Sequence, residues 1–381
     1  MTGKAPISIL QLRSSAGLYG ADRMVLALDQ GLRQQGVRSR LLSINNYLLD
    51  NQPLHDCSTR AGQDAVLLLC RGKLDMRTVT ALGNQIDQCA ADVLHVHDYK
   101  SAFYAWLATR RRPHVKLIAT LHGWVESSRA LRLYNTLEIA LLRRFDQLVV
   151  VSSSQVNRLS RAGIPVKRIC QIDNGIAISS KRHSTPDELR AGLGLENAGH
   201  VFAAVGRLSA EKNLALLLDA FTSVVASHPD ARLLLAGDGP ERQTLQEKTG
   251  QLGLQGQVSF AGNRTDMEQI YPLLDCLVLP SLSEGMPLVV LEAMSRGIPV
   301  IASAAGEIPR LLANSQYGHV VPVGDERALR MAMIHSVTHP GRHDAKAREY
   351  VETHHSIHAM AGRYLDVYQS LGTGSHERKS A

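Results

Sequence analysis

Short runs rich in leucine and β-branched residues alternate with amphipathic helical patterns along almost the whole chain of 381 residues. In the pattern at Asp22–Gln35, for example, apolar residues recur at helical spacing. Alternating strands and helices predict right-handed crossovers and a parallel sheet covered by helices on both faces. The strands predicted in the first half are Ile7–Leu12, Arg40–Ile44, Ala65–Leu69, Val93–His97, Lys116–Thr120 and Gln147–Val151.

The same alternation starts again after Gly175, so we predict an α/β protein of two Rossmann-like domains. The length also exceeds one compact core, which favours two domains. We expect domains over residues 1–175 and 176–355, a junction within 174–196, a final helix over 356–372 and a disordered tail over 373–381. The strands predicted in the second half are His200–Val205, Ala231–Ala236, Val258–Ala261, Cys276–Leu279 and Pro299–Ala302.

The composition excludes several classes of protein. No apolar run approaches the roughly 18 residues that a membrane-spanning helix needs. The first residues read as a strand, and their apolar stretch is too short for a signal peptide. The five cysteines are scattered without CxxC spacing, which argues against disulfides and zinc sites and for a reducing compartment. We therefore expect a cytoplasmic protein.

Positive charge is concentrated in the first half of the chain. Residues 1–175 hold 23 Lys and Arg against 13 Asp and Glu, a charge of +10, whereas residues 176–381 carry −3. Such asymmetry indicates an anionic partner for the first half, although solvated helix faces would also account for it. Nucleic acid is disfavoured, because aromatic residues are only 4% of the chain and are not interleaved with the basic ones.

The first candidate binding motif follows the predicted strand His200–Val205. Ligands of open parallel sheets bind beyond the carboxyl ends of the strands, so with two such sheets we expect a site in the cleft between them. Arg207 and Lys212 stand five residues apart, across a Gly turn and into a helix start. A planar fork and a point charge together suit a diphosphate. Alone, these two residues would read as solvated loop positions.

The second candidate motif follows the predicted strand Cys276–Leu279. Pro287 stands where the first helical position is expected, and the free N–H groups of a helix start bind anions. Glu284 and Glu292 are eight residues apart, roughly 12 Å at helical rise, which matches the reach from a hexose through a diphosphate to a ribose. Carboxylates accept hydrogen bonds from vicinal hydroxyls. The alternative is that Glu284 is a loop or cap residue and Glu292 an exposed helix position.

The spacing of these two motifs, Gly206-Arg207 with Lys212 and Glu284 with Glu292, resembles the retaining glycosyltransferases of family 4, which have the GT-B fold. Further matches extend the resemblance over roughly residues 7 to 312. They are Gly17–Asp22, His95–Asp98, Leu121–Gly123, Asn174–Ile176, Ala236–Pro240 and Phe260–Asp266.

The resemblance implies a role for each candidate residue. Arg207 and Lys212 would neutralise the leaving diphosphate, Glu284 would hold sugar hydroxyls, and Glu292 would bind the ribose. Further donor contacts would come from a set of loop residues: His122 facing the reacting sugar, Arg264 bordering the base, Gly17 and Gly20 approaching the diphosphate, and the amides of Gly285, Met286, Pro287 and Leu288.

The resemblance also implies the chemistry. No Asp-x-Asp occurs in the chain, so we expect no metal and no cofactor, with the leaving group stabilised by cations and a helix start. The family reacts with retention on the donor's front face. The loop Gly285-Met286-Pro287 departs from the aromatic residue and Gly that many members have there, which leaves the donor sugar open. A final helix at Met360–Leu371 should cross back to the first domain and pack in its core.

The predicted function is transfer of a sugar from a UDP- or GDP-sugar to a saccharide or lipid-linked acceptor, in the assembly of a cell-surface polysaccharide. The first domain would bind the acceptor and contact an anionic membrane at its inner face, and the second would bind the nucleotide-sugar. The alternatives are a non-catalytic nucleotide-sugar-binding scaffold and a GT-B epimerase or phosphorylase.

Overall fold

A computed structural model describes residues 7–15, 17–122, 129–178, 187–339 and 345–373. These residues form two units, which we describe separately: unit 1 is residues 1–177 with 354–381, and unit 2 is residues 178–353. Gly123, residues 179–186 of the expected junction and residues 374–381 of the expected tail lie outside the described part of the chain.

Unit 1 contains a parallel sheet of seven strands in the order β3-β2-β1-β4-β5-β6-β7. The order reverses between β1 and β4, which are neighbours in the sheet. The strands are β1 (Ser8–Ser14), β2 (Arg38–Ile44), β3 (Ala65–Leu68), β4 (Val93–Val96), β5 (Lys116–Leu121), β6 (Gln147–Val150) and β7 (Ile169–Gln171).

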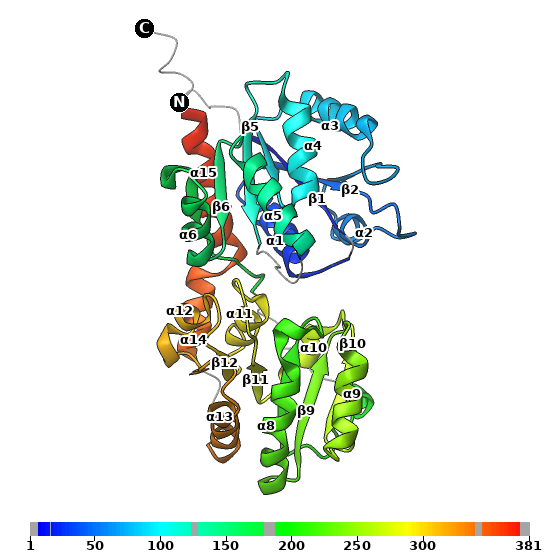
Figure 1. Ribbon diagram of the computed structural model, residues 1–381, viewed down its shortest axis with the longest axis vertical. Coiled ribbons are helices and arrows are strands. Elements are labelled where there is room, and N and C mark those ends of the chain that lie inside the picture. The colour runs from blue at the N-terminus through cyan, green and yellow to red at the C-terminus, as the bar shows by residue number, and fades with distance from the viewer. Residues whose placement is uncertain (1–6, 16, 123–128, 179–186, 340–344, 374–381) are drawn as a thin grey trace. The chain divides into compact units, whose positions relative to one another are not determined.

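Both faces of this sheet are buried by helices (Figure 1). Alternate residues of β1 enter different cores: Leu10 and Leu12 lie in one apolar cluster, and Ile9 lies in the other. The helices are α1 (Gly20–Gln34), α2 (Pro53–Arg60), α3 (Met76–Gln88), α4 (Tyr99–Thr109), α5 (Arg129–Leu142), α6 (Ser153–Arg161), the 3-10 turn η1 (Val166–Arg168) and α15 (Ile357–Thr373).

The last helix, α15, belongs to unit 1 although it comes at the end of the sequence. It packs against α1, with Met360, Tyr364 and Tyr368 in the same core as Ile9. A short parallel bridge pairs Ser356, just before α15, with Ile176, near the end of the first segment of unit 1. The predicted return of the final helix to the first domain is confirmed.

Unit 2 repeats the architecture with six parallel strands in the order β10-β9-β8-β11-β12-β13. Here the order reverses between β8 and β11. The strands are β8 (His200–Val205), β9 (Ala231–Ala236), β10 (Val258–Gly262), β11 (Cys276–Leu279), β12 (Val300–Ser303) and β13 (His319–Val321). The helices are α7 (Asp187–Gly192), η2 (Ala210–Lys212), α8 (Leu214–Ser227), α9 (Arg242–Gln251), α10 (Met267–Ile270), η3 (Tyr271–Leu273), α11 (Leu288–Met294), α12 (Ile308–Leu311), η4 (Ala313–Ser315), α13 (Glu326–Thr338) and α14 (Ala345–His354).

Each strand predicted from the sequence is present, with ends shifted by no more than two residues. The prediction missed β7 and β13, which have three residues each and lie at sheet edges. Such strands are defined by pairing with one neighbour, not by an apolar run of their own. Among the helices of the described residues, none is long and apolar enough to cross a membrane.

Candidate functional site

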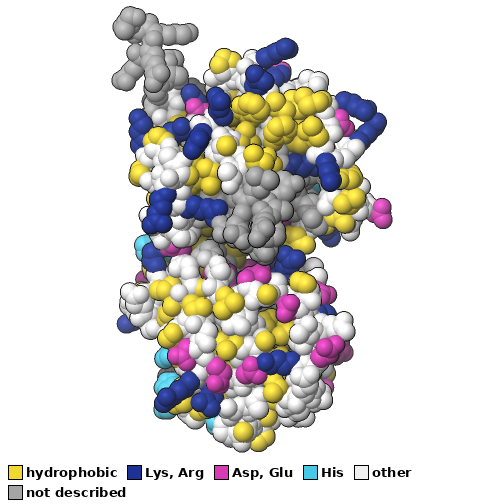
Figure 2. Space-filling model, in the orientation of Figure 1, with side chains coloured by type: hydrophobic (Ala, Val, Ile, Leu, Met, Phe, Trp, Pro, Cys, Tyr) yellow, Lys and Arg dark blue, Asp and Glu magenta, His cyan; other side chains and the backbone are white. Residues whose placement is uncertain are grey.

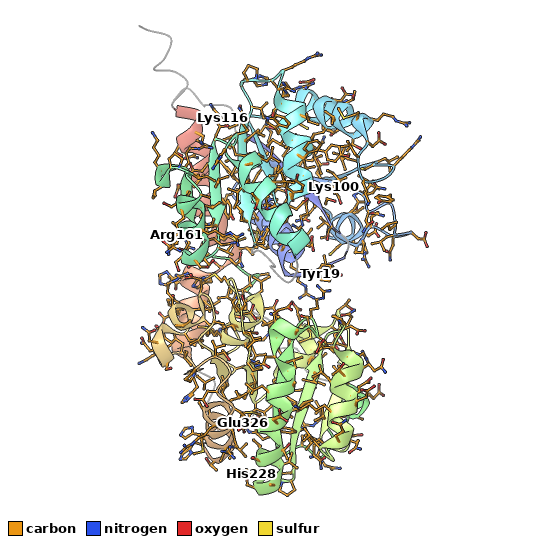
Figure 3. The ribbon with its side chains drawn as sticks, in the orientation of Figure 1. Tyr19, Lys100, Lys116, Arg161, His228 and Glu326 are labelled. Carbon is orange, nitrogen blue, oxygen red and sulfur yellow. The ribbon has the colours of Figure 1, made fainter. Side chains whose placement is uncertain are left out.

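In each unit, candidate residues follow the two strands at which the strand order reverses. Ligands of doubly wound sheets bind at this point, beyond the carboxyl ends of the strands. In unit 1 the loop with Gly17 follows β1 and His97 follows β4. In unit 2 Arg207 follows β8 and Glu284 follows β11. Figure 3 shows the corresponding end of unit 1 at Tyr19, opposite Lys116, where β5 begins.

Glycines bring the backbones of several loops into contact at this edge of unit 2. Gly237, after β9, has a φ of +140°, and a Cβ there would lie 1.8 Å from the carbonyl oxygen of Gly206. Gly306, after β12, has a φ of +55°, and a Cβ there would lie 2.0 Å from the carbonyl oxygen of Glu284. The loops that carry Arg207 and Glu284 are therefore held by backbone packing that side chains would prevent.

Lys212 and Glu284 form an ion pair across the reversal point. Lys212, at the end of η2, donates from Nζ to Oε1 of Glu284 at 2.6 Å, and the two side chains are 20% and 9% exposed. The Ser281 hydroxyl donates to the same oxygen at 2.6 Å. Oε2 of Glu284 accepts no hydrogen bond from the described residues. One carboxylate oxygen and the remaining ammonium donors are thus left for a ligand.

Arg207 is exposed and makes no hydrogen bond or ion pair with any described side chain. It lies close enough to Glu211 to act on that carboxyl: burial acts to raise the pKa of Glu211, but a hydrogen bond from Ser209 and the charges of Lys212 and Arg207 bring the pKa below its ordinary value. Arg207 therefore adds positive potential to the loop while its guanidinium remains available.

The segment between the two glutamates is a loop followed by a short helix. Pro287 is the N-cap of α11, with extended backbone, so the prediction that it holds the first helical position is wrong by one residue. Proline has no N–H, which leaves the amides of Gly285, Met286 and Leu288 as donors. Only the part from Leu288 onward is helical, so a helical rise does not describe the whole span from Glu284 to Glu292.

Glu292 is half-buried in α11, not an exposed helix position. Its Oε2 accepts a hydrogen bond from the Tyr271 hydroxyl, and the guanidinium of Arg296 lies 4.6 Å from the centre of the Tyr271 ring. Arg264, in the loop after β10, pairs with Asp266 through Nε at 2.8 Å and Nη2 at 2.5 Å. Both side chains are therefore oriented by neighbours that the sequence analysis did not identify.

In unit 1 the loop between β1 and α1 is anchored by a buried carboxylate. Asp22 accepts from Nε of Arg13 at 2.9 Å and from the amide of Tyr19 at 2.9 Å. Gly17 packs against the Tyr19 ring, where a Cβ would lie 2.7 Å from a ring carbon, whereas nothing lies within 4 Å of a Cβ at Gly20. The open side of Gly20 is compatible with close approach of a ligand to the start of α1.

His122, after β5, lies beside a second histidine that the sequence analysis did not select. Its Nε2 is 3.3 Å from Nδ1 of His97, and the two rings are stacked. Burial is the main cause that lowers the pKa of each well below its ordinary value, and the nearby charge of Arg13 acts in the same direction. Both rings are therefore neutral at pH 7. The sequence signals for these two histidines were the His-x-His of residues 95–97 and the Leu-His-Gly of residues 121–123.

The structure thus brings together Lys212 with Glu284 in unit 2 and His97 with His122 in unit 1. Of the other charged candidates, Arg207 follows β8, Arg264 follows β10, and Glu292 lies in α11, the helix after β11. Among the described residues, no group of three His, Cys, Asp or Glu side chains could hold a metal ion.

Two family models match the chain, one in each half. Residues 19–180 match the model described as Glycosyltransferase Family 4, and residues 186–354 match that of Glycosyl transferases group 1. The break between the two matches falls close to the division between the units.

Curated proteins and solved structures are similar over most of the chain. The N-acetyl-alpha-D-glucosaminyl L-malate synthase of Bacillus anthracis is 28% identical over 74% of this chain and 75% of its own. The Escherichia coli UDP-Gal:alpha-D-GlcNAc-diphosphoundecaprenol alpha-1,3-galactosyltransferase is 27% identical over 68% and 70%. The structure of Anabaena HepE in complex with UDP and glucose has a TM-score of 0.83 at 19% identity, covering 96% and 100% of the two chains.

Proposed function

Because this chain belongs to the glycosyltransferases of family 4 and has their GT-B fold, we propose that it transfers a sugar from a nucleotide-diphosphate donor to a hydroxyl of a lipid-linked saccharide. The reaction proceeds with retention and without a metal. The observation that carries the proposal is the exposed Arg207 beside the Lys212–Glu284 pair, at the point where the strand order of unit 2 reverses.

In the proposed donor site, positive charge meets the diphosphate. The guanidinium of Arg207 makes no hydrogen bond or ion pair with a described side chain. Lys212 donates one N–H group to Glu284 and has others for the diphosphate. Negative charge develops on the diphosphate as the glycosidic bond breaks, so both cations act most strongly in the transition state. The amides of Gly285, Met286 and Leu288 supplement them at the start of α11.

The two glutamates bind the two ends of the donor. Glu284 is oriented by Lys212 and Ser281 and offers Oε2 to sugar hydroxyls. Glu292, oriented by Tyr271, binds the ribose. Arg264, held by Asp266, borders the base. The roles of His122 toward the sugar and of Gly17 and Gly20 toward the diphosphate are carried over from the family resemblance.

UDP is expected to stabilise the protein without a divalent metal. In thermal unfolding with EDTA, UDP at about 100 times its dissociation constant should add roughly 2.7 kcal/mol of stability, with GDP and ADP as comparisons. UDP is the nucleotide in the similar Anabaena structure. Arg207→Ala should lose most of the response. No shift with any of the three nucleotides would contradict the donor site and favour the scaffold alternative.

Retention is tested on the product itself. With the matching nucleotide-sugar and an acceptor, early NMR spectra should show a new glycoside whose anomeric configuration equals that of the donor. A product of inverted configuration would contradict the proposed front-face reaction. A free epimerised sugar, or a requirement for inorganic phosphate, would assign the epimerase or phosphorylase alternative.

The lipid part of the acceptor is supported by an apolar surface on unit 1. Six of the twelve exposed large hydrophobic residues among the described residues follow β2 and β3: Tyr47, Leu48, Leu49, Leu69, Leu74 and Met76. The two loops are joined, because the Asn45 side chain accepts from the amide of Cys70 at 2.5 Å. They lie at the carboxyl edge of the sheet, as the loop with Gly17 does.

Basic residues accompany these apolar side chains. Arg71, Lys73 and Arg77 are exposed in the second loop and the start of α3. Figure 2 shows dark blue side chains around hydrophobic ones on the visible face of unit 1, and more Asp and Glu on that of unit 2. Exposed leucines interleaved with cations suit the interface of an anionic membrane. The printed name of the E. coli relative includes a diphosphoundecaprenol acceptor, which agrees with a lipid-linked substrate.

The double variant Leu48→Ser, Leu74→Ser is expected to bind anionic vesicles at least about tenfold more weakly, since each leucine loses apolar burial in the interface. Flotation with phosphatidylglycerol vesicles at low salt measures the bound fraction. Met331→Ser, a change at an exposed methionine on α13 of unit 2, should bind as the unmodified protein does. Failure of the unmodified protein to float would remove the membrane from the proposal and leave the donor chemistry intact.

A further inference from the structure

A continuous series of buried polar side chains connects the C-terminal helix α15 to His122. Its members are His122, His97, Gln11, Tyr368, His95, Thr120 and Tyr364, which come from β1, from β4 and the residue after it, from β5 and the residue after it, and from α15. All except His122 are at most 3% exposed. Burying a polar group without a hydrogen bond costs free energy of folding. In this series each side chain is hydrogen-bonded.

The contacts follow one another without a gap. His122 Nε2 lies 3.3 Å from His97 Nδ1, and His97 Nε2 lies 2.7 Å from Gln11 Oε1. Gln11 Nε2 donates to the Tyr368 hydroxyl at 3.4 Å, which lies 2.8 Å from His95 Nδ1. His95 Nε2 lies 2.8 Å from Thr120 Oγ1, which lies 3.0 Å from the Tyr364 hydroxyl.

The side-chain amide of Gln11 sets the direction of these bonds. Its oxygen faces His97, so His97 carries its proton on Nε2 and presents a lone pair on Nδ1. The neighbouring nitrogen of His122 must then be a donor, which places the His122 proton on Nε2. On the other side, the Gln11 nitrogen donates to the Tyr368 hydroxyl, and we assign that hydroxyl as the donor to His95 Nδ1.

The same direction continues as far as Thr120. With Tyr368 donating to its Nδ1, His95 is protonated on Nε2 and donates to Thr120, and either hydroxyl can be the donor between Thr120 and Tyr364. Each group between His122 and Thr120 is thus both a donor and an acceptor, in one sense from His122 towards α15. Reversing the series would require the Gln11 amide to turn over and all three imidazoles to change tautomer together.

We propose that this hydrogen-bond series is a positioning device that holds His122 as the neutral tautomer protonated on Nε2. His122 then presents a lone pair on Nδ1, so it accepts a hydrogen bond from a hydroxyl of the donor sugar and cannot donate one. Gln11, His97 and Tyr368 are positioning residues that act through His122. The sugar contact rests on the function proposed above, whereas the tautomer rests on the contacts of unit 1 alone.

Burial keeps the series uncharged. It lowers the pKa of His95 to about 3, and the pKa values of His97 and His122 also lie well below the ordinary value. At pH 7 the rings differ only in which nitrogen carries the proton, which is the property that a neighbouring acceptor or donor controls.

The tautomer is measured directly by NMR of protein with 15N-labelled histidine, since the ring 15N shifts distinguish a protonated nitrogen from a bare one. We expect His122 and His97 to be protonated on Nε2. In Tyr368→Phe the hydroxyl next to Gln11 is lost, and we expect the ring shifts of both histidines to move and a form of His122 protonated on Nδ1 to appear. If Tyr368→Phe does not fold, Gln11→Leu is the second variant. It removes the amide between His97 and Tyr368 and should have the same effect on the ring shifts.

Tyr104→Phe is the matched control. Tyr104 is equally buried in unit 1, and its hydroxyl accepts from the amide of Asp75 at 2.8 Å, outside the series. Its loss should leave the His97 and His122 spectra unchanged. In transfer assays Tyr368→Phe should lower kcat by about tenfold, because one hydrogen bond that orients His122 through the series is lost. KM for the nucleotide-sugar should stay nearly constant. Tyr104→Phe should not change kcat.

Two results would overturn the positioning device: His122 protonated on Nδ1 in the unmodified protein, or histidine spectra that neither Tyr368→Phe nor Gln11→Leu alters. A third result would contradict only the proposed function and not the positioning device. If His122 has the expected tautomer but His122→Ala transfers sugar at the normal rate, the hydrogen-bond series stands and the contact between His122 and the donor does not.

Discussion

Arg207→Ala is expected to lower kcat/KM for sugar transfer by about 100- to 1,000-fold, the loss seen when a group that stabilises transition-state charge is removed. Because the side chain is exposed and makes no hydrogen bond or ion pair with a described side chain, the unfolding midpoint should hardly change. Steady-state assays with the nucleotide-sugar identified by thermal stabilisation measure the first quantity, and calorimetry the second.

Two further substitutions define what Arg207 does. Arg327→Ala removes another exposed arginine of unit 2, on α13, and should leave kcat/KM unchanged. Arg207→Lys keeps the charge but not the planar fork, so it should recover only part of the rate. If Arg207→Ala transferred sugar at a normal rate, the leaving diphosphate would not be stabilised at this loop.

Lys212→Ala should also lower the rate, because it removes the ion pair with Glu284 as well as a cation at the diphosphate. Without the ammonium, Glu284 keeps the Ser281 hydroxyl but has no cation, so its carboxylate is repelled by the diphosphate of the donor. Lys212 contacts the proposed sugar-binding carboxylate in the structure, and in the proposed reaction it also neutralises the leaving group.

Gly237→Ala is expected to destabilise unit 2 by about 3–5 kcal/mol, since it combines a strained backbone with a steric overlap. The φ of Gly237 is +140°, and the new Cβ would lie 1.8 Å from the carbonyl oxygen of Gly206. Both groups are backbone, so neither can turn away. Urea unfolding followed by circular dichroism measures the change.

Gly256→Ala is the matched control in the same unit. Nothing lies within 4 Å of a Cβ there, and the backbone does not have a positive φ. Its free energy of unfolding should stay within about 0.5 kcal/mol of the unmodified value. Because Gly206 precedes Arg207, Gly237→Ala should also weaken nucleotide binding. A Gly237→Ala protein as stable as the Gly256→Ala protein would show that these loops do not pack as described.

Most secondary structure could be predicted from the sequence, because each element has a local pattern. The buried strand β8 reads as an apolar run after His200, β1 has apolar residues at Ile9, Leu10 and Leu12, and α1 shows helical periodicity. Arg207 and Glu284 could be placed after strands for the same reason. The edge strands β7 and β13 have no such pattern, since a single neighbour holds them in place.

Partners distant along the chain could not be predicted in this way. Tyr364 and Tyr368 were expected only to pack in a core; they do lie in it, and their hydroxyls also bond Thr120 and His95. Helical spacing shows that a tyrosine is buried but not which polar group its hydroxyl meets.

By itself the sequence determined two parallel α/β sheets and the placement of candidate residues after strand ends, because hydrophobic periodicity acts over a few residues at a time. The return of the last helix was implied by the family resemblance, not by periodicity. Only the tertiary structure decided that Lys212 pairs with Glu284, 72 residues away, and that Tyr368 meets His95, 273 residues away. The strand order is the physical reason. It makes β8 the neighbour of β11 and β1 the neighbour of β4, and the covered sheet face then brings α15 onto the same strands.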